Sequence, residues 1–312
     1  NPSIGVLWLP SVIGAEGTAR GTIIYRNQYA AFMNMCWPLA IVLGIRLYRP
    51  VLEKFALLKR KKNTPGLADK LSLVFQKAAL PFWAAAFMIL AVIFSRSRGG
   101  IIVMLIIAGL LLLLLPFSRR AKSATGAAFL LFMLFYGGII GFQQVTDRFL
   151  IIYEGAMGRI LLWLDSLTML TDHLYTGIGM GAYKRLSPVY LQNVPDTVWF
   201  DFAHNEYIEL SIELGLPIMV LLLLWIGWGM VRYGRRIAQN LHDAGSVAAL
   251  SDNNILAIGA FCAIIGFLLH GLSDFIWRLP VNAVYAVILL AMLQASLASN
   301  ANDEQTGPDG IH

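Results

Sequence analysis

The residue types best suited to chemistry gather in one short stretch, residues 199–217, just before a long apolar run. Within this stretch Asp201 can act as a helix N-cap, which would place His204 in the first turn of a helix. The positive end of the helix dipole disfavours a charged imidazole, so we predict an uncharged His204 that can accept a proton. The alternative is a histidine that only caps a helix or hydrogen-bonds between helices. Asn205 and Glu213 are the other polar candidates of this stretch.

A second group of candidates consists of arginines at the edge of apolar runs. Arg96 and Arg98 occupy a short turn between two such runs. Arginine on an outer turn opposes the usual bias of basic residues and suggests an anionic partner, although snorkelling toward lipid head groups is the alternative. Guanidinium groups bind phosphate through paired N–H groups and keep their charge at any working pH. The same side is expected to carry Arg20, Arg26, Arg159, Lys184 and Arg185. Together these cations favour a phosphate-bearing ligand.

The sequence around these candidates is that of a membrane protein. Hydrophobic residues make up 58% of the chain and charged residues only 13%, whereas soluble proteins average about 25% charged residues. Several apolar runs approach the roughly 20 residues needed to cross a bilayer. We therefore predict an all-α polytopic membrane protein. The chain starts at Asn1 and shows no signal-peptide pattern, so we expect the C-terminal part of a larger helix bundle.

The apolar runs predict about seven transmembrane helices and a division of the chain into four parts. The expected spans lie near residues 29–47, 79–94, 101–117, 127–142, 217–231, 255–271 and 279–297. Residues 1–142 carry four spans and an outer N-terminal loop, residues 143–216 form a large outer helical segment, residues 217–297 carry three spans, and residues 298–312 form a disordered tail. Most Lys and Arg residues lie in the loops on one side, which the positive-inside rule makes cytoplasmic.

The outer segment contains a further helix and a glycine-rich turn. Residues 158–171 have the apolar spacing of an amphipathic helix, which Arg159 opens. Gly177, Gly179 and Gly181 lack the strand and the spacing of a dinucleotide-binding motif and indicate a turn instead. The two cysteines, Cys36 and Cys262, lie inside apolar runs without CxxC motifs or clustered histidines. We predict no metal, no cofactor and no nucleic-acid partner.

Taken in order, these motifs resemble the family of O-antigen ligases and O-antigen polymerases, which are bacterial inner-membrane glycosyltransferases. The resemblance covers about residues 15–295. It is carried by Arg20-Gly21-Thr22 to Asn27 before a span, Ser95 to Gly100 opening a span, Arg159, Asp172-His173 to Gly181, and His204-Asn205 with Glu213-Leu214-Gly215. It implies that the 143–216 segment is periplasmic and that additional helices precede this chain.

The resemblance also implies a reaction. A glycan would move from undecaprenyl diphosphate to an acceptor hydroxyl, such as one on lipid A core, at the periplasmic face and without a nucleotide sugar or a metal. The paired arginines of the family correspond to Arg98 and Arg159, and its histidine to His204. We expect an inverting transfer in which the arginines hold the diphosphate and His204 acts on the acceptor. The other expected diphosphate- or substrate-binding residues are Arg20, Arg26, Asn27, Arg96, Asn205 and Glu213.

Four alternatives to a ligase stay open at this point. A polymerase would join repeat units on the same lipid, and a protein O-oligosaccharyltransferase would use protein hydroxyls as acceptors. Outside the family, a transporter of lipid-linked sugars would need ionisable groups at mid-span, and the apolar runs nearly lack them. A non-catalytic membrane scaffold would give no role to the outward arginines.

Overall fold

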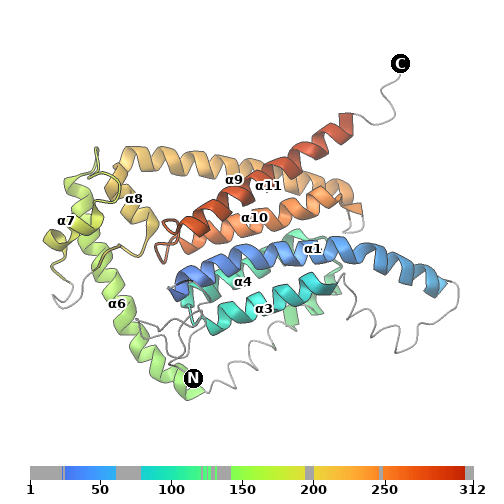
Figure 1. Cartoon of the computed structure of the whole chain (residues 1–312), viewed down its shortest axis with the longest axis horizontal. Helices are drawn as coiled ribbons and strands as arrows, with labels where there is room; N and C mark the ends of the chain where they lie inside the picture. Colours follow the sequence, from blue (N-terminus) through green and yellow to red (C-terminus); the bar gives the residue numbers. More distant parts are fainter. Residues whose placement is uncertain are drawn as a thin grey trace. The chain divides into compact units, whose positions relative to one another are not determined.

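The chain is all-helical in the part that the structure describes. This computed structural model describes residues 23, 25–60, 79–120, 122–124, 126–127, 131, 142–193, 200–245 and 249–305. The helices are α1 (Arg26–Arg60), α3 (Leu80–Phe94), α4 (Arg98–Leu114), α6 (Phe142–Asp172), α7 (Tyr183–Tyr190), α8 (Glu206–Leu214), α9 (Leu216–Ala244), α10 (Asp252–His270) and α11 (Pro280–Gln305) (Figure 1). The predicted all-α class is confirmed within these ranges.

Several helices have the length and composition of membrane spans. Among the described residues, four qualify: Arg26–Pro50 within α1, Leu216–Ala244, Asp252–His270 and Pro280–Ala298 within α11. α3 and α4 are equally apolar but shorter, with 15 and 17 residues. The span expected near residues 127–142 lies almost wholly outside the described residues. A multi-pass membrane protein is therefore confirmed, while the number of seven spans stays a prediction.

The chain divides into two compact units, which differ from the four predicted parts. The first unit comprises residues 1–116, 233–270 and 276–312, and the second comprises residues 117–232 and 271–275. The predicted outer segment, residues 143–216, falls entirely within the second unit. A loop of five residues, Gly271–Phe275, also belongs to the second unit although it is far from the rest of that unit in sequence. We call it the 271–275 loop.

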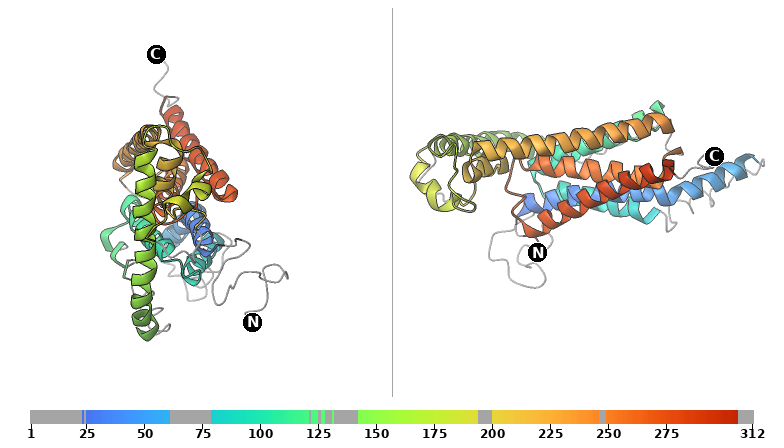
Figure 2. Two further views of the ribbon diagram at one scale, coloured as in Figure 1. Left: turned by 90° about the vertical axis from the view of Figure 1, so that its left-hand side faces the viewer. Right: turned by 90° about the horizontal axis from the view of Figure 1, so that it is seen from above.

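In the first unit, long apolar helices pack along one another. α1 packs against α3, α4 and α10, and α10 packs against α4 and α11 (Figures 1 and 2). Small residues allow the close approach: a Cβ atom on Gly100 would lie 2.6 Å from the Cβ of Ala30. At one end of the bundle Arg46 of α1 pairs with Asp252 at 2.8 Å, and Arg49 donates to the Leu250 carbonyl at 2.8 Å. The first unit is thus fastened by apolar packing and by ion pairs at this end.

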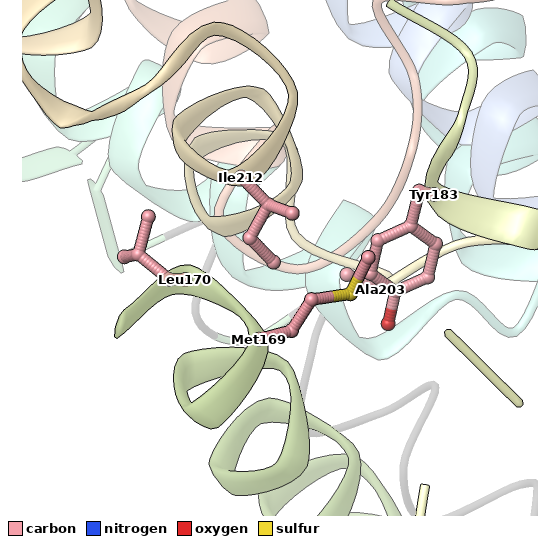
Figure 3. Packing of buried hydrophobic residues seen from close by; sticks show 5 residues of the cluster. All are labelled: Met169, Leu170, Tyr183, Ala203 and Ile212. Carbon is pink, nitrogen blue, oxygen red and sulfur yellow. The ribbon is translucent and has the colours of Figure 1, made fainter. Parts of the chain in front are cut away.

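In the second unit, α6, α7 and α8 enclose a small apolar core. Its buried members are Met169, Leu170, Tyr183, Ala203 and Ile212 (Figure 3). Ala203 belongs to the stretch that leads into α8, so this core fixes the chain next to His204. α6 begins at Phe142, and the predicted amphipathic helix over residues 158–171 is therefore its C-terminal half.

Two helix ends also lie away from their predicted positions. α11 continues to Gln305, beyond the predicted end of the last span at residue 297. Residues 298–305 of the predicted disordered tail are therefore helical, and residues 306–312 lie outside the described part of the chain. α9 likewise continues to Ala244, well beyond the predicted end of the fifth span at residue 231.

Candidate functional site

His204 lies just before α8 and not in its first turn. The N-cap of α8 is Asn205, whose Oδ1 accepts the N–H groups of Tyr207 at 3.0 Å and Ile208 at 3.2 Å. The prediction of Asp201 as the N-cap is therefore wrong, because Asn205 supplies an equally effective capping side chain four residues later. His204 adopts a left-handed backbone with φ 52°. Non-glycine residues are held in this conformation at a cost, and such residues cluster at functional sites.

The imidazole of His204 is held by a carboxylate that lies 70 residues further along the chain. Its Nδ1 lies 2.9 Å from Oδ1 of Asp274, and the Asp274 side chain is only 5% exposed against 27% for His204. A carboxylate at this distance favours a proton on Nδ1, which leaves Nε2 as the acceptor of the ring. The pair therefore has the arrangement of a general base that is oriented by an acid group.

Aromatic rings surround this pair. The Phe275 ring meets the imidazole of His204 edge to face, with 5.1 Å between centroids, and Phe200 does so at 6.2 Å. Phe275 also stacks on Phe202 with 4.1 Å between centroids. Such apolar surroundings strengthen the hydrogen bond between Nδ1 and the carboxylate, because less water competes for it.

Reasoning from the sequence did not identify Asp274 as the partner of His204. The usable signal was an acidic residue in a short, largely apolar loop between two spans, where a carboxylate needs a partner. Nothing in the local sequence indicates that this partner is His204.

Arg159 contacts the same loop as His204. The guanidinium of Arg159, on α6, donates from one terminal nitrogen to the carbonyl oxygen of Ser273 at 3.0 Å. Arg159 and His204, two of the predicted site residues, therefore contact neighbouring residues of the 271–275 loop, Ser273 and Asp274. The hydrogen bond occupies only part of the Arg159 side chain, because a guanidinium has five N–H donors.

The turn that precedes α4 buries its serines and exposes its arginines. Ser95 Oγ donates to the Val92 carbonyl at 2.6 Å and accepts the Ser97 N–H at 3.2 Å, and Ser97 Oγ in turn accepts the Gly100 N–H at 3.2 Å. Arg96, with φ 55°, and Arg98 are both exposed. We call residues 95–100 the arginine turn. Two exposed guanidinium groups at the N-terminus of a 17-residue helix form a favourable environment for an anion.

The other predicted arginine and amide candidates lie at the start of α1 or outside the described residues. Arg26 is exposed and Asn27 is half-buried, and both belong to the first turn of α1 in the first unit. Arg20 lies outside the described residues. Of the predicted site residues, the first unit therefore holds Arg26, Asn27, Arg96 and Arg98, and the second holds Arg159, His204, Asn205 and Glu213.

Glu213 is buried and contacts the glycine turn. Its Oε1 accepts the N–H of Gly181 at 2.9 Å, and its backbone carbonyl accepts the N–H of Gly179 at 3.0 Å. Gly177 packs so closely on the end of α8 that a Cβ atom there would lie 2.6 Å from the backbone nitrogen of Gly215. These contacts support a role for Glu213 in positioning α8, while its role in binding substrate stays a prediction.

Further buried contacts fix the residue before His204. The N–H of Ala203 donates to Oε2 of Glu209 at 2.8 Å, and the carbonyl of Ala203 accepts the indole N–H of Trp163 at 2.9 Å. Both backbone polar groups of Ala203 are therefore satisfied by side chains from α8 and α6. This arrangement holds the left-handed backbone of His204 from its N-terminal side, as the Asn205 cap does from the other.

Burial is the main cause of the raised pKa of two tyrosines in the second unit. Burial raises the pKa of Tyr207 to about 12, with a further contribution from neighbouring Glu206. Burial likewise raises the pKa of Tyr183 above its ordinary range, partly offset by the hydrogen bond to Ser166. Both phenols therefore stay protonated near neutral pH, and neither is a candidate base.

Two comparisons with known proteins bear on the family of this chain. The family model described as O-antigen ligase matches residues 83–223. A comparison with curated proteins gives no match to the chain. The matched region contains Arg98, Arg159 and His204, whereas Asp274 lies outside it. The family match indicates a membrane enzyme that transfers glycans, of the ligase or polymerase type. Its partners are a lipid-linked glycan and a glycan acceptor. The resemblance inferred from the motifs is confirmed over residues 83–223, where the chain matches the O-antigen ligase family model.

Proposed function

We propose that this protein transfers a glycan from undecaprenyl diphosphate to an acceptor hydroxyl, in the first instance on lipid A core. The observation that carries the proposal is the contact of His204 with Asp274, at 2.9 Å between Nδ1 and Oδ1. It provides an oriented imidazole next to a loop that Arg159 also contacts. The family match over residues 83–223 supports the same class of reaction.

His204 acts on the acceptor in the proposed mechanism. Its Nε2 takes the proton of the acceptor hydroxyl while the oxygen attacks the anomeric carbon of the donor. A new carbon–oxygen bond forms as the bond between the anomeric carbon and the phosphate oxygen breaks, and the electron pair leaves with undecaprenyl diphosphate. Attack from the face opposite the leaving group inverts the configuration of the anomeric carbon. No step in this sequence uses a metal.

Arginines stabilise the leaving group in the proposed mechanism. Arg98 and Arg159 hold the diphosphate, because guanidinium groups pair with phosphate oxygens and remain charged as negative charge grows there. Removing one such electrostatic contact typically lowers kcat by about 10²- to 10³-fold. The further residues that we assign to diphosphate or substrate binding are Arg20, Arg26, Asn27, Arg96, Asn205 and Glu213.

The proposed setting is the bacterial inner membrane, with the site at its periplasmic face. This orientation follows from the excess of Lys and Arg in the loops on the opposite side. An undecaprenyl chain stays in the bilayer, so a diphosphate site at the end of membrane helices allows the donor to bind without leaving the lipid.

The test uses the purified protein in lipid nanodiscs with a synthetic undecaprenyl-diphosphate oligosaccharide. Lipid A core is offered as the acceptor in one reaction and a second lipid-linked oligosaccharide in the other, and the products are identified by mass spectrometry. We expect His204→Ala and Arg98→Ala each to lower transfer at least about 10²-fold. His242→Ala, an exposed histidine near the end of α9, is the matched control and should retain transfer. Normal transfer by both site variants would overturn the proposal, and elongation of the second lipid-linked unit in place of lipid A core would reassign the chain as a polymerase.

A further inference from the structure

We propose that the glycine turn and α7 form a surface of the second unit that binds the anionic head groups of the lipid bilayer. Five exposed residues make up this surface, which we call the head-group surface: Tyr175, Met180, Lys184, Arg185 and Val189. The proposal does not depend on the transfer reaction, since it requires only that the chain crosses a membrane. It gives the glycine turn and α7 a partner that is separate from the surroundings of His204.

The glycine turn is fastened to the end of α9 where a membrane span begins (Figure 1). The N–H of Leu216, the first residue of α9, donates to the Leu174 carbonyl at 2.8 Å. The N–H of Ile178 donates to the Ile212 carbonyl in the last turn of α8 at 3.0 Å. The turn is therefore held at the level of the first residue of the span.

The sequence of α9 places this level at the bilayer surface. From Leu216 onward, the first charged residue of the helix is Arg232. At 1.5 Å per residue, the uncharged stretch is about 24 Å long, which is less than the roughly 30 Å of a hydrocarbon core. The start of α9 therefore cannot extend far into water. The exposed side chains of Leu216 and Ile218 continue the apolar surface of the span up to the glycine turn.

The glycine turn exposes two large side chains at this level. Tyr175 is 76% exposed and Met180 is 66% exposed. Met180 lies between Gly179 and Gly181, whose φ values of 94° and 73° shape the turn around it. The boundary between water and hydrocarbon is where a tyrosine ring, apolar with one polar tip, is most stable. Head groups and the upper part of the acyl chains therefore suit both side chains better than water does.

α7 adds a face that is both basic and apolar. Tyr183 and Ser187 are buried and lie four residues apart, so they mark the side of α7 that packs on the core. At 3.6 residues per turn, the opposite side carries Lys184, Arg185 and Val189. Both basic residues are exposed, and Val189 is 71% exposed. A helix face that combines cations with exposed apolar side chains is typical of a helix lying at a membrane surface.

The charge of this region favours anionic head groups over neutral ones. Residues 173–193 contain Lys184 and Arg185 but no aspartate or glutamate. The preceding acid, Asp172, interacts with Tyr190, which lies on the other side of α7. Lysine and arginine can keep their stems along apolar groups while their charged ends reach phosphate. Each basic residue close to an anionic leaflet strengthens attachment about five-fold.

Attachment at this surface also holds α8 at a constant depth. Oε1 of Glu213, in the last turn of α8, accepts the N–H of Gly181 at 2.9 Å. Asn205 caps the other end of the same helix and directly follows His204. The head-group surface and His204 are therefore connected through one short helix, and lipid contacts at the first set the height of the second above the hydrocarbon core.

The test measures the depth of a spin label in the full chain by electron paramagnetic resonance. Cys36→Ala and Cys262→Ala remove the native thiols, and Thr176→Cys places the label on an exposed position of the glycine turn. Labels at Leu221→Cys, 67% exposed within the apolar stretch of α9, and at His242→Cys, exposed near its end, provide the lipid and water references. Access of a water-soluble nickel chelate and of oxygen reports depth. The protein is studied in nanodiscs of phosphatidylcholine alone and of equal parts phosphatidylcholine and phosphatidylglycerol.

We expect the label at position 176 to lie between the two references, shielded from the nickel chelate more strongly when phosphatidylglycerol is present. High salt should reduce this difference. Lys184→Gln combined with Arg185→Gln should lower the ratio of shielded to unshielded label on the order of 10-fold in phosphatidylglycerol nanodiscs. Arg119→Gln combined with Arg120→Gln is the matched control, because it removes the same charge from another exposed basic pair of the second unit and should leave the label unchanged. The thermal unfolding midpoint of each variant shows that it is folded.

Three outcomes would overturn the proposal. The first is a label at position 176 that the nickel chelate reaches as easily as the label at position 242 in both kinds of nanodisc. The second is shielding that is the same with and without phosphatidylglycerol and in the Lys184 and Arg185 variant, which would mean that no anionic head group is bound. The third is spectral broadening between two labels at position 176, which would assign the surface to a second copy of the chain. None of these measurements uses transfer activity, so a failure of the proposed function would leave the test intact.

Discussion

The arginine turn and the surroundings of His204 are built in different ways. In the arginine turn, the hydrogen bonds of the two serines join residues only two or three positions apart. Around His204, the partners are far away in sequence: Trp163 and Ala203 are 40 residues apart, His204 and Asp274 are 70 apart, and Arg159 and Ser273 are 114 apart. Both regions hold a non-glycine residue in the left-handed conformation, Arg96 in one and His204 in the other.

This difference indicates which substitutions should disturb the structure of each region. The start of the arginine turn depends on the hydrogen bonds of its own serines, and α1 contacts the turn at Gly100, where Asn34 donates to the carbonyl at 2.9 Å. A site made of distant contacts depends on the packing of α6, α8 and the 271–275 loop at once. Substitutions that disturb α8 should therefore affect His204 strongly, and substitutions in the arginine turn should have smaller and more local effects.

The largest effect is expected from Gly177→Ala in the second unit. The added Cβ would lie 2.6 Å from the backbone nitrogen of Gly215, and Gly177 has φ 63°. A left-handed alanine costs about 1–2 kcal/mol and forced overpacking adds about 1–3 kcal/mol. We expect a marked fall in the thermal unfolding midpoint. In NMR spectra of the protein with labelled histidine, we also expect loss of the His204 signal that reports a proton on Nδ1. Gly179→Ala is the control, since Gly179 has φ 94° but no atom within 4 Å of an added Cβ, and an equal loss there would contradict the close-approach argument.

A smaller effect is expected from Gly100→Ala in the arginine turn. Its Cβ would lie 2.6 Å from the Cβ of Ala30 on α1, without any strain in φ. Overpacking of this kind costs about 1–3 kcal/mol, against a gain in helix propensity of up to about 1 kcal/mol. Gly109→Ala on the same helix meets no atom within 4 Å and should be neutral or stabilising. The difference between the thermal unfolding midpoints of Gly100→Ala and Gly109→Ala measures the effect of the contact with α1. Equal midpoints would contradict a close contact between Gly100 and α1.

Ser97→Ala should have a modest effect that stays within the arginine turn. The substitution removes the side chain that accepts the Gly100 N–H at the start of α4. Loss of an N-cap costs about 1 kcal/mol. Ser97→Asn keeps a capping oxygen and should restore most of the stability. Hydrogen exchange should show faster opening of the first turn of α4 in Ser97→Ala and unchanged protection in α8; a loss of protection in α8 would mean that the turn is not a local structure.

The effect that is smallest at neutral pH concerns the alkaline stability of the second unit. The folded-state pKa of Tyr207 is raised from 10.0 to about 12. A raised folded-state pKa contributes stability that is complete below pH 10 and is lost as the pH rises toward 12, because the unfolded chain then ionises more readily. Wild type should lose stability over this range more steeply than Tyr207→Phe in denaturant titrations at several pH values. Parallel curves for the two proteins would show that burial does not shift this phenol.

Much of the fold could be predicted because it depends on neighbouring residues. The apolar runs that became α3, α4, α10 and most of α11 are visible in the sequence, since a span needs a long apolar segment whatever it packs against. The exposed arginines at the start of α4 could be predicted for the same reason. The Asp201 cap was predicted wrongly because two good capping residues lie four positions apart, and local sequence does not show which one the chain will use.

The candidate site was predictable only in part. Residue types and their order predict His204, Arg98 and Arg159 as site residues, and these assignments stay predictions although the match over residues 83–223 includes all three. The sequence did not predict the hydrogen bond of Glu213 with Gly181, the contact of Arg159 with Ser273, or the contact of Asp274 with His204. Each of these contacts joins segments that are more than 30 residues apart.

By itself, the sequence determined that this protein is helical, that it crosses a membrane several times, and that an arginine turn opens α4. Hydropathy and capping act over a few residues, so these features can be read from the order of residues alone. Only the tertiary structure decided which carboxylate holds His204. A hydrogen bond of 2.9 Å requires atoms to be placed within a few tenths of an ångström, and α6, α8 and the anchored 271–275 loop together provide that placement.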